Sequence, residues 1–132
     1  DDYAHHPCEI KTTLDALKSA VKNENRVVAV FQPHRYSRFK SLWNEFKLAF
    51  NSADLLLVTD IYSAGENALQ GITSENFVSD IKKSNAKYIK GDIEKITDSI
   101  LPFLKENDII ITLGAGSITN LGKYLLQKAG EK

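Results

Sequence analysis

The sequence predicts an α/β domain in which a mostly parallel sheet lies between two layers of helices, a three-layer, doubly wound and Rossmann-like fold. Apolar runs alternate with helix-period segments along all 132 residues. The apolar runs are continuous rather than alternating, which is typical of parallel strands buried on both faces. The length, together with the absence of any repeat, low-complexity segment or linker, predicts a single domain over residues 1–132.

Four apolar runs define the expected strands. Three of them are strong and rich in β-branched and leucine residues, namely Val27–Phe31, Leu55–Thr59 and Ile109–Leu113. A weaker run lies at 87–89. Because a helix-period segment separates each run from the next, the strands are expected to be joined by right-handed crossovers and to lie parallel.

Helix-period apolar residues define five expected helices, with stripes at 10–21, 39–50, 77–81, 93–104 and 118–125. The first follows Pro7, a residue that is tolerated in the first turn of a helix. The fourth is expected to begin with Asp92 as its N-cap and to be limited by Pro102.

Composition excludes several classes of protein. Lys plus Arg and Asp plus Glu both number 17, so the zero net charge predicts neither a nucleic-acid partner nor a polybasic membrane anchor. No apolar run is long enough to span a membrane. A single cysteine cannot form an intrachain disulfide and does not indicate an oxidising compartment. The absence of methionine, even at position 1, leads us to expect a processed product or a piece of a larger protein.

Polar and glycine-containing segments follow the apolar runs or precede helices at 1–7, 32–38, 60–66 and 113–117. Ligands of open α/β sheets bind beyond the carboxyl ends of the strands, so these segments are expected to meet there. The first two contain all three histidines and two of the three arginines, whereas the lysines are spread over the rest of the chain. This placement indicates chemistry at that edge.

The arginine pair carries the clearest signal. Arg35 and Arg38 are three residues apart at an expected helix start, so both can lie on one face. Two guanidinium groups suit a carboxylate or a phosphate bound in bidentate fashion. An exposed, salt-bridged first turn is the alternative. The helix dipole disfavours cations at an N-terminus, and this favours anion binding.

Other groups near the edge are more ambiguous. Asp1 and Asp2 could bind a ribose or help to hold a metal, or could equally cap the first helix. The three histidines with Cys8 lack zinc-type spacing, so no metal site is predicted. Cys8 is expected to be a buried structural residue rather than a nucleophile.

Two loops admit more than one interpretation. The string GAGSIT at 114–119 follows a strand as a dinucleotide loop would, but Thr119 stands at the third glycine position. A turn whose backbone amides face a ligand is the better prediction. The segment 60–66, with two acids and a tyrosine, could contribute to the edge or be a plain surface turn. No complete P-loop occurs, so this chain alone should not bind a nucleoside triphosphate strongly.

Four motifs in order resemble the C-terminal domain of the Mur ligases: DDYAHHP at 1–7, FQPHRYSR at 31–38, YSAGE at 62–66 and GAGSI at 114–118. The second is the most specific. It resembles the motif of the ligases that add L-alanine to UDP-N-acetylmuramate. The related ligases that recycle murein peptides have a different sequence at the histidine–arginine stretch of this motif. Cys8 is a departure, since the family commonly has threonine at that position.

The resemblance implies one domain of a three-domain, cytoplasmic bacterial enzyme of peptidoglycan precursor synthesis. This domain would bring the amino acid, and two further domains would bind UDP-N-acetylmuramate and ATP with Mg²⁺. In the implied ATP-dependent reaction, the muramate carboxylate is phosphorylated and the amine of L-alanine attacks the acyl phosphate to form an amide. The isolated domain is expected to be inactive.

The resemblance also implies roles for individual residues. His34, Arg35 and Arg38 would act on the L-alanine carboxylate and on the developing phosphate charge. Asp2 would contact the ATP ribose. The remaining residues would form the alanine pocket, Tyr3, His5 and His6 as its lining and Gly114 and Ala115 as a backbone wall.

Two alternatives stay open at the level of sequence. One is the recycling ligase, which joins a murein tripeptide to the same UDP-sugar. The other is a free-standing module that binds a small anion or a nucleotide through the glycine turn and the arginine pair.

Overall fold

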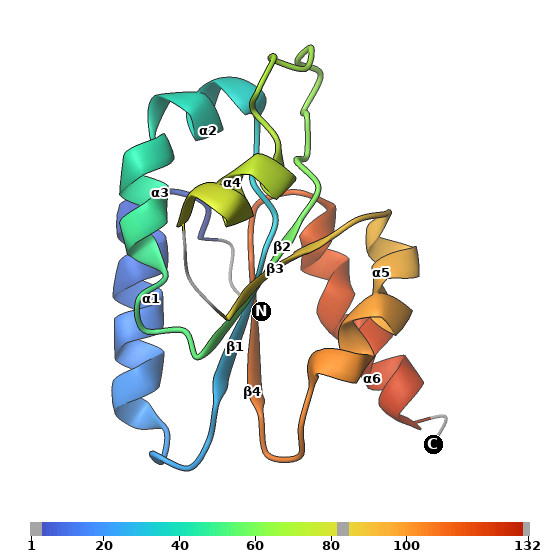
Figure 1. The fold of residues 1–132 in the computed structure, drawn as a ribbon. Coiled ribbons are helices and arrows are strands. Elements are labelled where there is room, and N and C mark those ends of the chain that lie inside the picture. Colours follow the sequence, from blue (N-terminus) through green and yellow to red (C-terminus); the bar gives the residue numbers. More distant parts are fainter. Residues whose placement is uncertain (1–3, 82–84, 131–132) are drawn as a thin grey trace.

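The computed structural model describes residues 4–81 and 85–130 and contains one sheet (Figure 1). All pairings are parallel, and the strand order is β3-β2-β1-β4. The strands are β1 (Val27–Phe31), β2 (Leu55–Thr59), β3 (Ala86–Ile89) and β4 (Ile109–Leu113). The three strong apolar runs are therefore confirmed residue for residue, and the weak run begins one residue earlier than predicted.

Helices cover both faces of the sheet, which confirms the three-layer α/β prediction (Figure 1). One face carries α1 (Pro7–Ala20), α2 (Tyr36–Ser41), α3 (Trp43–Ala49) and α4 (Ser74–Ile81), and the other carries α5 (Ile93–Ile100) and α6 (Leu121–Gly130). The chain runs outward from β1 to β3 and then returns to place β4 on the other side of β1. This reversal between β1 and β4 is the position at which doubly wound sheets bind ligands.

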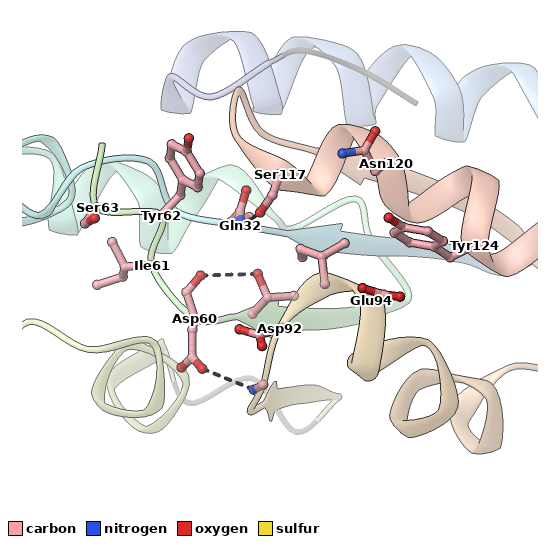
Figure 2. Close-up of a pocket in the computed structure, with 13 residues that line it drawn as sticks. Gln32, Asp60, Ile61, Tyr62, Ser63, Asp92, Glu94, Ser117, Asn120 and Tyr124 are labelled. Carbon is pink, nitrogen blue, oxygen red and sulfur yellow. Dashed lines mark hydrogen bonds between the residues drawn. The ribbon is translucent and has the colours of Figure 1, made fainter. Parts of the chain in front are cut away.

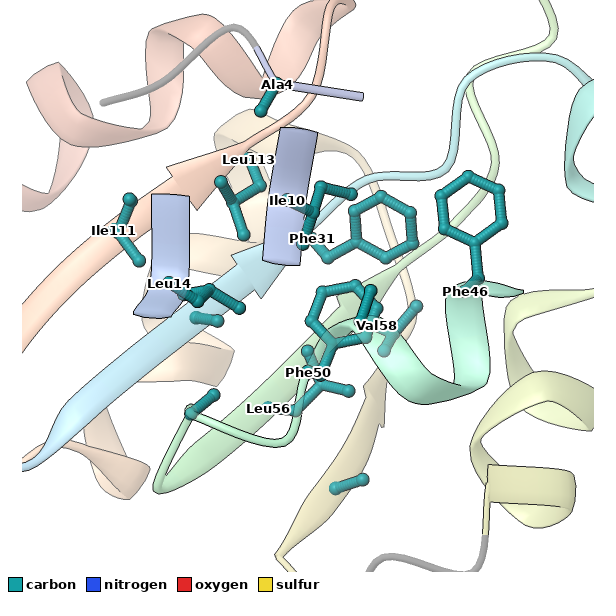
Figure 3. Close-up of a cluster of buried hydrophobic side chains, with 14 of the residues drawn as sticks. Ala4, Ile10, Leu14, Phe31, Phe46, Phe50, Leu56, Val58, Ile111 and Leu113 are labelled. Carbon is teal, nitrogen blue, oxygen red and sulfur yellow. The ribbon is translucent and has the colours of Figure 1, made fainter. Parts of the chain in front are cut away.

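The sheet separates two hydrophobic cores. The core beneath α1 and α3 is aromatic: the ring of Phe31 lies 4.9 Å from that of Phe50 and 5.4 Å from that of Phe46, measured between centroids (Figure 3). The core beneath α5 and α6 is aliphatic, with Ile96 and Leu121 fully or almost fully buried. Burial on both faces explains why the strands read as continuous apolar runs.

The prediction of one continuous helix at 39–50 is wrong, because this part of the chain forms two helices, α2 and α3. Leu42 has φ −111° and ψ 20°, so α2 ends before it and α3 begins after it. The apolar stripe continues across the break, with Phe39 and Phe46 both buried. Periodicity of apolar residues therefore cannot detect a single non-helical residue at this point.

The predicted limits of the fourth helix, Asp92 as its N-cap and Pro102 near its end, are confirmed for α5 except for the capping bond. Asp92 occupies the N-cap position, but its side chain makes no capping hydrogen bond. Its backbone carbonyl instead accepts bonds from the amides of Lys95 and Ile96, at 2.8 and 2.9 Å. Pro102 lies in a 3₁₀ turn, η1 (Leu101–Phe103), directly after the helix, as expected of a residue that limits it.

The last predicted helix begins as a second 3₁₀ turn, η2 (Ser117–Asn120), and continues as α6. No helix within the described part of the chain is both long and apolar enough to cross a membrane.

Candidate functional site

The loops after β1 and β2 are bonded to each other beyond the ends of the strands. The amide of Tyr62 donates to the carbonyl of Pro33 at 2.8 Å, and the amide of Arg35 donates to the carbonyl of Tyr62 at 2.8 Å. A parallel bridge pairs His34 with Tyr62. The segments 32–38 and 60–66 therefore meet at the carboxyl edge, as the sequence predicts.

Gln32 bonds the end of β1 to the glycine turn after β4. Its side chain accepts from the amide of Ile118 at 3.0 Å and donates to the hydroxyl of Ser117 at 2.9 Å, and its amide donates to the carbonyl of Leu113 at 3.0 Å. Gln32 is only 4 % exposed, so these bonds lie inside the protein. The amide of Ile118 is therefore bonded to Gln32, and the prediction that backbone amides of this turn face a ligand stays a prediction for the other residues of the turn.

Both glycines of the turn are required by close approach. Gly114 has φ +149°, and a methyl group there would lie 3.0 Å from the carbonyl oxygen of Gln32. Gly116 has φ −104° and ψ −145°, and a methyl group there would lie 2.5 Å from Cγ of Tyr62. The distance at Gly116 is shorter than real Cβ atoms show, and at Gly114 a positive φ adds to a tight contact, so the spacing of the two glycines reflects packing at the edge.

The two predicted arginines line one cavity. It has a volume of about 390 Å³, and its walls include His6 from the N-terminal segment together with Arg35, Ser37 and Arg38. The structure thus brings part of the segment 1–7 to the arginine pair. Guanidinium groups on a shared cavity can bind a carboxylate or a phosphate through paired hydrogen bonds.

Arg35 has an unusual backbone conformation, with φ 71° and ψ 132°. It is the N-cap residue of α2 but supplies no side-chain cap. The carboxylate of Glu66, from the loop after β2, takes that role by accepting from the amide of Ser37 at 2.9 Å and from its hydroxyl at 2.5 Å. These bonds, with a smaller contribution from the Arg35 charge, hold the pKa of Glu66 below its usual value.

His34 connects the arginine pair to Tyr62. Nη1 of Arg38 lies 3.3 Å from Nδ1 of His34. Because a guanidinium can only donate, Nδ1 is the acceptor and the ring proton is on Nε2. Burial, followed by the positive charge of Arg38, lowers the pKa of His34 and keeps the ring neutral at neutral pH.

Two further rings surround His34. Tyr62 stacks on it with centroids 5.4 Å apart and planes at 9°, and His5 contacts it edge-on at 5.8 Å. The adjacent residues His5 and His6 and the distant residue His34 therefore belong to one site.

A second cavity of about 450 Å³ lies beside the reversal point between β1 and β4 (Figure 2). It is lined by Gln32, Tyr62 and Ser117, and by the carboxylates Asp60, Asp92 and Glu94. Asp60 accepts hydrogen bonds from the Tyr88 hydroxyl and, at 3.1 Å, from the Gly91 amide. Burial and the Asp60 carboxylate raise the pKa of Tyr88.

The sequence places the segments 32–38 and 60–66 at the edge but gives no role to Gln32, Tyr62 or Glu66. The acids after β3 are not among the predicted site residues. The available signal was position: each of these residues follows a predicted strand, or lies one loop beyond it, at the carboxyl edge.

Several of the predicted site residues are not seen to line the two cavities. Asp1, Asp2 and Tyr3 are outside the described residues. Gly114 is buried and Ala115 half-buried, and neither lines the two cavities.

The prediction that Cys8 is buried is wrong. Cys8 is exposed, because the core face of α1 is formed by Pro7, Ile10 and Leu14 and position 8 lies off that face. Within residues 4–81 and 85–130, no group of three or more His, Cys, Asp or Glu side chains is placed to hold a metal ion.

The fold and the two cavities define a ligand-binding domain of the doubly wound α/β class, with an arginine pair and a neutral histidine at the carboxyl edge of the sheet. Comparison with known families gives a narrower result. The family described as Mur ligase, glutamate ligase domain, matches residues 1–116, and the chain belongs to this family.

The chain is similar to curated ligases over nearly its whole length. It is 47 % identical to the UDP-N-acetylmuramate–L-alanine ligase of Geotalea daltonii, over 99 % of this chain and 29 % of that protein. It is 46 % identical to the ligase of the same name from Brachyspira hyodysenteriae, over 97 % of this chain and 28 % of that protein. The chain thus spans less than a third of the length of these relatives.

Solved structures agree on the fold. The UDP-N-acetylmuramate–alanine ligase of Thermotoga maritima has a TM-score of 0.74 and 27 % identity, over 99 % of this chain and 26 % of that one. A murein peptide ligase from Psychrobacter arcticus has a TM-score of 0.69 at 21 % identity, over 100 % of this chain and 27 % of that one, and shares the fold.

Proposed function

We propose that this chain is the amino-acid-binding domain of a UDP-N-acetylmuramate–L-alanine ligase, which acts in the cytoplasm in peptidoglycan precursor synthesis. The observation that carries the proposal is the cavity in which Arg35 and Arg38 meet beside a neutral His34. The curated relatives, at 42–47 % identity, carry the name of that enzyme. The murein peptide ligase, by contrast, resembles the chain at the level of fold.

The arginine pair would bind the α-carboxylate of L-alanine. Two guanidinium groups on one cavity fix both oxygens of a carboxylate and so orient the amine at the neighbouring carbon. Orientation of this kind converts an encounter between two reactants into a nearly unimolecular step. The amine would then attack the activated carboxyl group of the muramate, forming the amide and releasing phosphate.

His34 would act as a hydrogen-bond donor rather than as a base. Its Nδ1 accepts from Arg38, so the nitrogen that remains for a substrate is the protonated Nε2. A fixed N–H dipole beside two cations would stabilise the negative charge that develops on the tetrahedral intermediate or on the departing phosphate. The lowered pKa of His34 keeps the ring in this neutral, donating form.

ATP, Mg²⁺, UDP-N-acetylmuramate and the two further domains belong to the same proposal. ATP would supply the activation of the muramate carboxyl group. Among the described residues, no group of three or more His, Cys, Asp or Glu side chains is placed to hold an ion, and Mg²⁺ is therefore assigned to no residue of this chain. Roles for Asp2 at the ribose and for Tyr3, Gly114 and Ala115 at the alanine stay predictions.

The proposal is tested in the full-length ligase by phosphate release that depends on ATP, UDP-N-acetylmuramate and L-alanine. Arg35→Ala is expected to lower kcat/KM for L-alanine about 10²-fold or more, since it removes a fixed cation from the site. Lys40→Ala is the matched control, because Lys40 lies exposed on the same helix but does not line the cavity. Near-normal turnover in Arg35→Ala would remove this residue from the mechanism.

The same assay separates the recycling ligase. An enzyme that accepts a murein tripeptide and not L-alanine would contradict the proposed substrate. The parent sequence is expected to carry a phosphate-binding P-loop in another domain, and a parent without one would contradict the ligase itself.

A further inference from the structure

Tyr62 connects the 450 Å³ cavity to the loop that carries Arg35. It lines the 450 Å³ cavity, while its backbone is bonded on both sides to the loop that carries Arg35. Among the described residues, none lines both this cavity and the arginine cavity. The stacked pair formed by Tyr62 and His34 is what connects one region to the other, because His34 is also bonded to Arg38.

The Tyr62 ring is held on two sides although the residue is 40 % exposed. His34 lies parallel to it at 5.4 Å. The backbone at Gly116 lies so close that a methyl group there would be 2.5 Å from Cγ of Tyr62. The Tyr62 ring and the side-chain oxygen of Gln32 therefore leave no room for a side chain at Gly116. Figure 2 shows the ring rising beside Ser117, away from Asp60.

Because Arg38 is bonded to His34, an amino acid whose carboxylate binds the arginine pair would lie beside this stack. Its first side-chain carbon is separated from the carboxyl carbon by two bonds, which is about 2.5 Å. The ring that contacts Arg38 is His34, and the ring behind it is Tyr62. A methyl group needs little room there, whereas a branched side chain would have to displace a ring that is held by its neighbours.

We propose that Tyr62 determines the size of the amino acid that the site accepts, with Gly116 and His34 holding its ring in place. This inference rests on the proposed function and adds to it a residue that selects the substrate. A hydrophobic wall that discriminates by a single methylene group is worth about 10- to 200-fold in kcat/KM. The effect is therefore within the range of a steady-state assay.

The experiment compares L-alanine with L-valine in the full-length ligase, with kcat and KM measured separately for each amino acid. Tyr62→Ala is expected to raise the ratio of kcat/KM for L-valine to that for L-alanine at least about 10-fold. Tyr62→Phe keeps the ring and removes the hydroxyl, so its ratio should stay within about twofold of the wild-type ratio. A general loss of structure would lower both activities and leave the ratio unchanged.

A second variant, Tyr62→Leu, keeps the inference testable if Tyr62→Ala does not fold. Tyr62→Leu keeps an apolar contact with His34 and Gly116 but shortens the wall, and it should also raise the ratio. An unchanged ratio in folded Tyr62→Ala or Tyr62→Leu would overturn the inference, as would a Tyr62→Phe ratio as high as that of Tyr62→Ala. A wild-type enzyme that does not ligate L-alanine would instead overturn the proposed function, so the two failures are distinguishable.

Discussion

At the scale of single residues, Arg35 combines an unfavourable backbone with a side chain that lines the site. Its φ of 71° with ψ of 132° is a conformation that residues with a Cβ atom rarely adopt. The surrounding bonds maintain it: its amide donates to Tyr62, and its carbonyl accepts from Phe39. Strain at a residue that faces a cavity is common at functional sites, where the geometry of the side chain matters more than local stability.

The strain at Arg35 predicts a difference between two substitutions that remove the same guanidinium. Arg35→Gly should be more stable than Arg35→Ala by about 1 kcal/mol, because glycine adopts positive φ without a Cβ penalty. Both should lose turnover of L-alanine. Urea unfolding of the two variants, alongside the ligase assay, measures the difference. Equal stability of the pair would show that the backbone of Arg35 is unstrained.

At the scale of elements, α2 depends on a cap supplied by another loop. It has six residues and no capping side chain at Arg35, and helices this short are marginal without tertiary support. Glu66 supplies that support by binding the amide and the hydroxyl of Ser37. The loop after β2 thereby sets the position of the helix turn that carries Arg35 and Arg38.

Removal of this cap should weaken substrate binding more than chemistry. Glu66→Ala is expected to raise KM for L-alanine about 10-fold with a smaller effect on kcat, since the arginine pair would lose its fixed orientation. Glu66→Gln retains a neutral acceptor and should fall between Glu66→Ala and wild type. Glu45→Ala, an exposed carboxylate on α3, serves as the control. Equal kinetics in Glu66→Ala and Glu45→Ala would refute the positioning role.

At the scale of the whole molecule, an ion pair joins the starts of β1 and β4 at the edge opposite the site. Arg26 donates from Nε to Asp108 at 3.0 Å and from Nη2 at 2.6 Å, and the Asp108 side chain is 4 % exposed. The Arg26 hydrogen bonds are the main reason that the pKa of Asp108 is lowered. The ends of the two strands that flank the reversal point are therefore joined on both edges, by Arg26 at one and by Gln32 at the other.

The lowered pKa determines how this pair contributes to stability. A carboxylate whose pKa is lower in the folded state stabilises the fold above its unfolded pKa of about 3.9 and loses that contribution as the pH falls through the folded value. Asp108→Asn should lower the free energy of unfolding by about 2 kcal/mol at pH 7, a value reduced from that of a fully buried pair because Arg26 is partly exposed. The deficit relative to wild type should shrink below pH 4.

Urea unfolding at pH 7 and pH 3 checks this prediction. Asp98→Asn is the control, because Asp98 forms an exposed pair with Lys128 at 3.6 Å. It should change stability by less than about 0.5 kcal/mol at either pH. A deficit in Asp108→Asn that is the same at both values of pH would mean that the charge of Asp108 is not its source.

The sequence by itself determined the α/β class, the three strong strands and the edge at which the functional segments meet. These features depend on local patterns: continuous apolar runs such as Leu55–Thr59 record burial on two faces, and the position of a loop follows from the strand before it. The arginine pair was predictable for the same reason, because two residues three apart on a helix share a face.

Only the tertiary structure decided the break at Leu42, the exposure of Cys8 and the contacts that build the site. Glu66 caps a helix turn 29 residues earlier, and Gln32 binds an amide 86 residues later. These pairs meet because the strand order β3-β2-β1-β4 places the exits of β2 and β4 on either side of that of β1. Strand order is a property of the packed sheet, and no local pattern of residues encodes which distant loops it brings together.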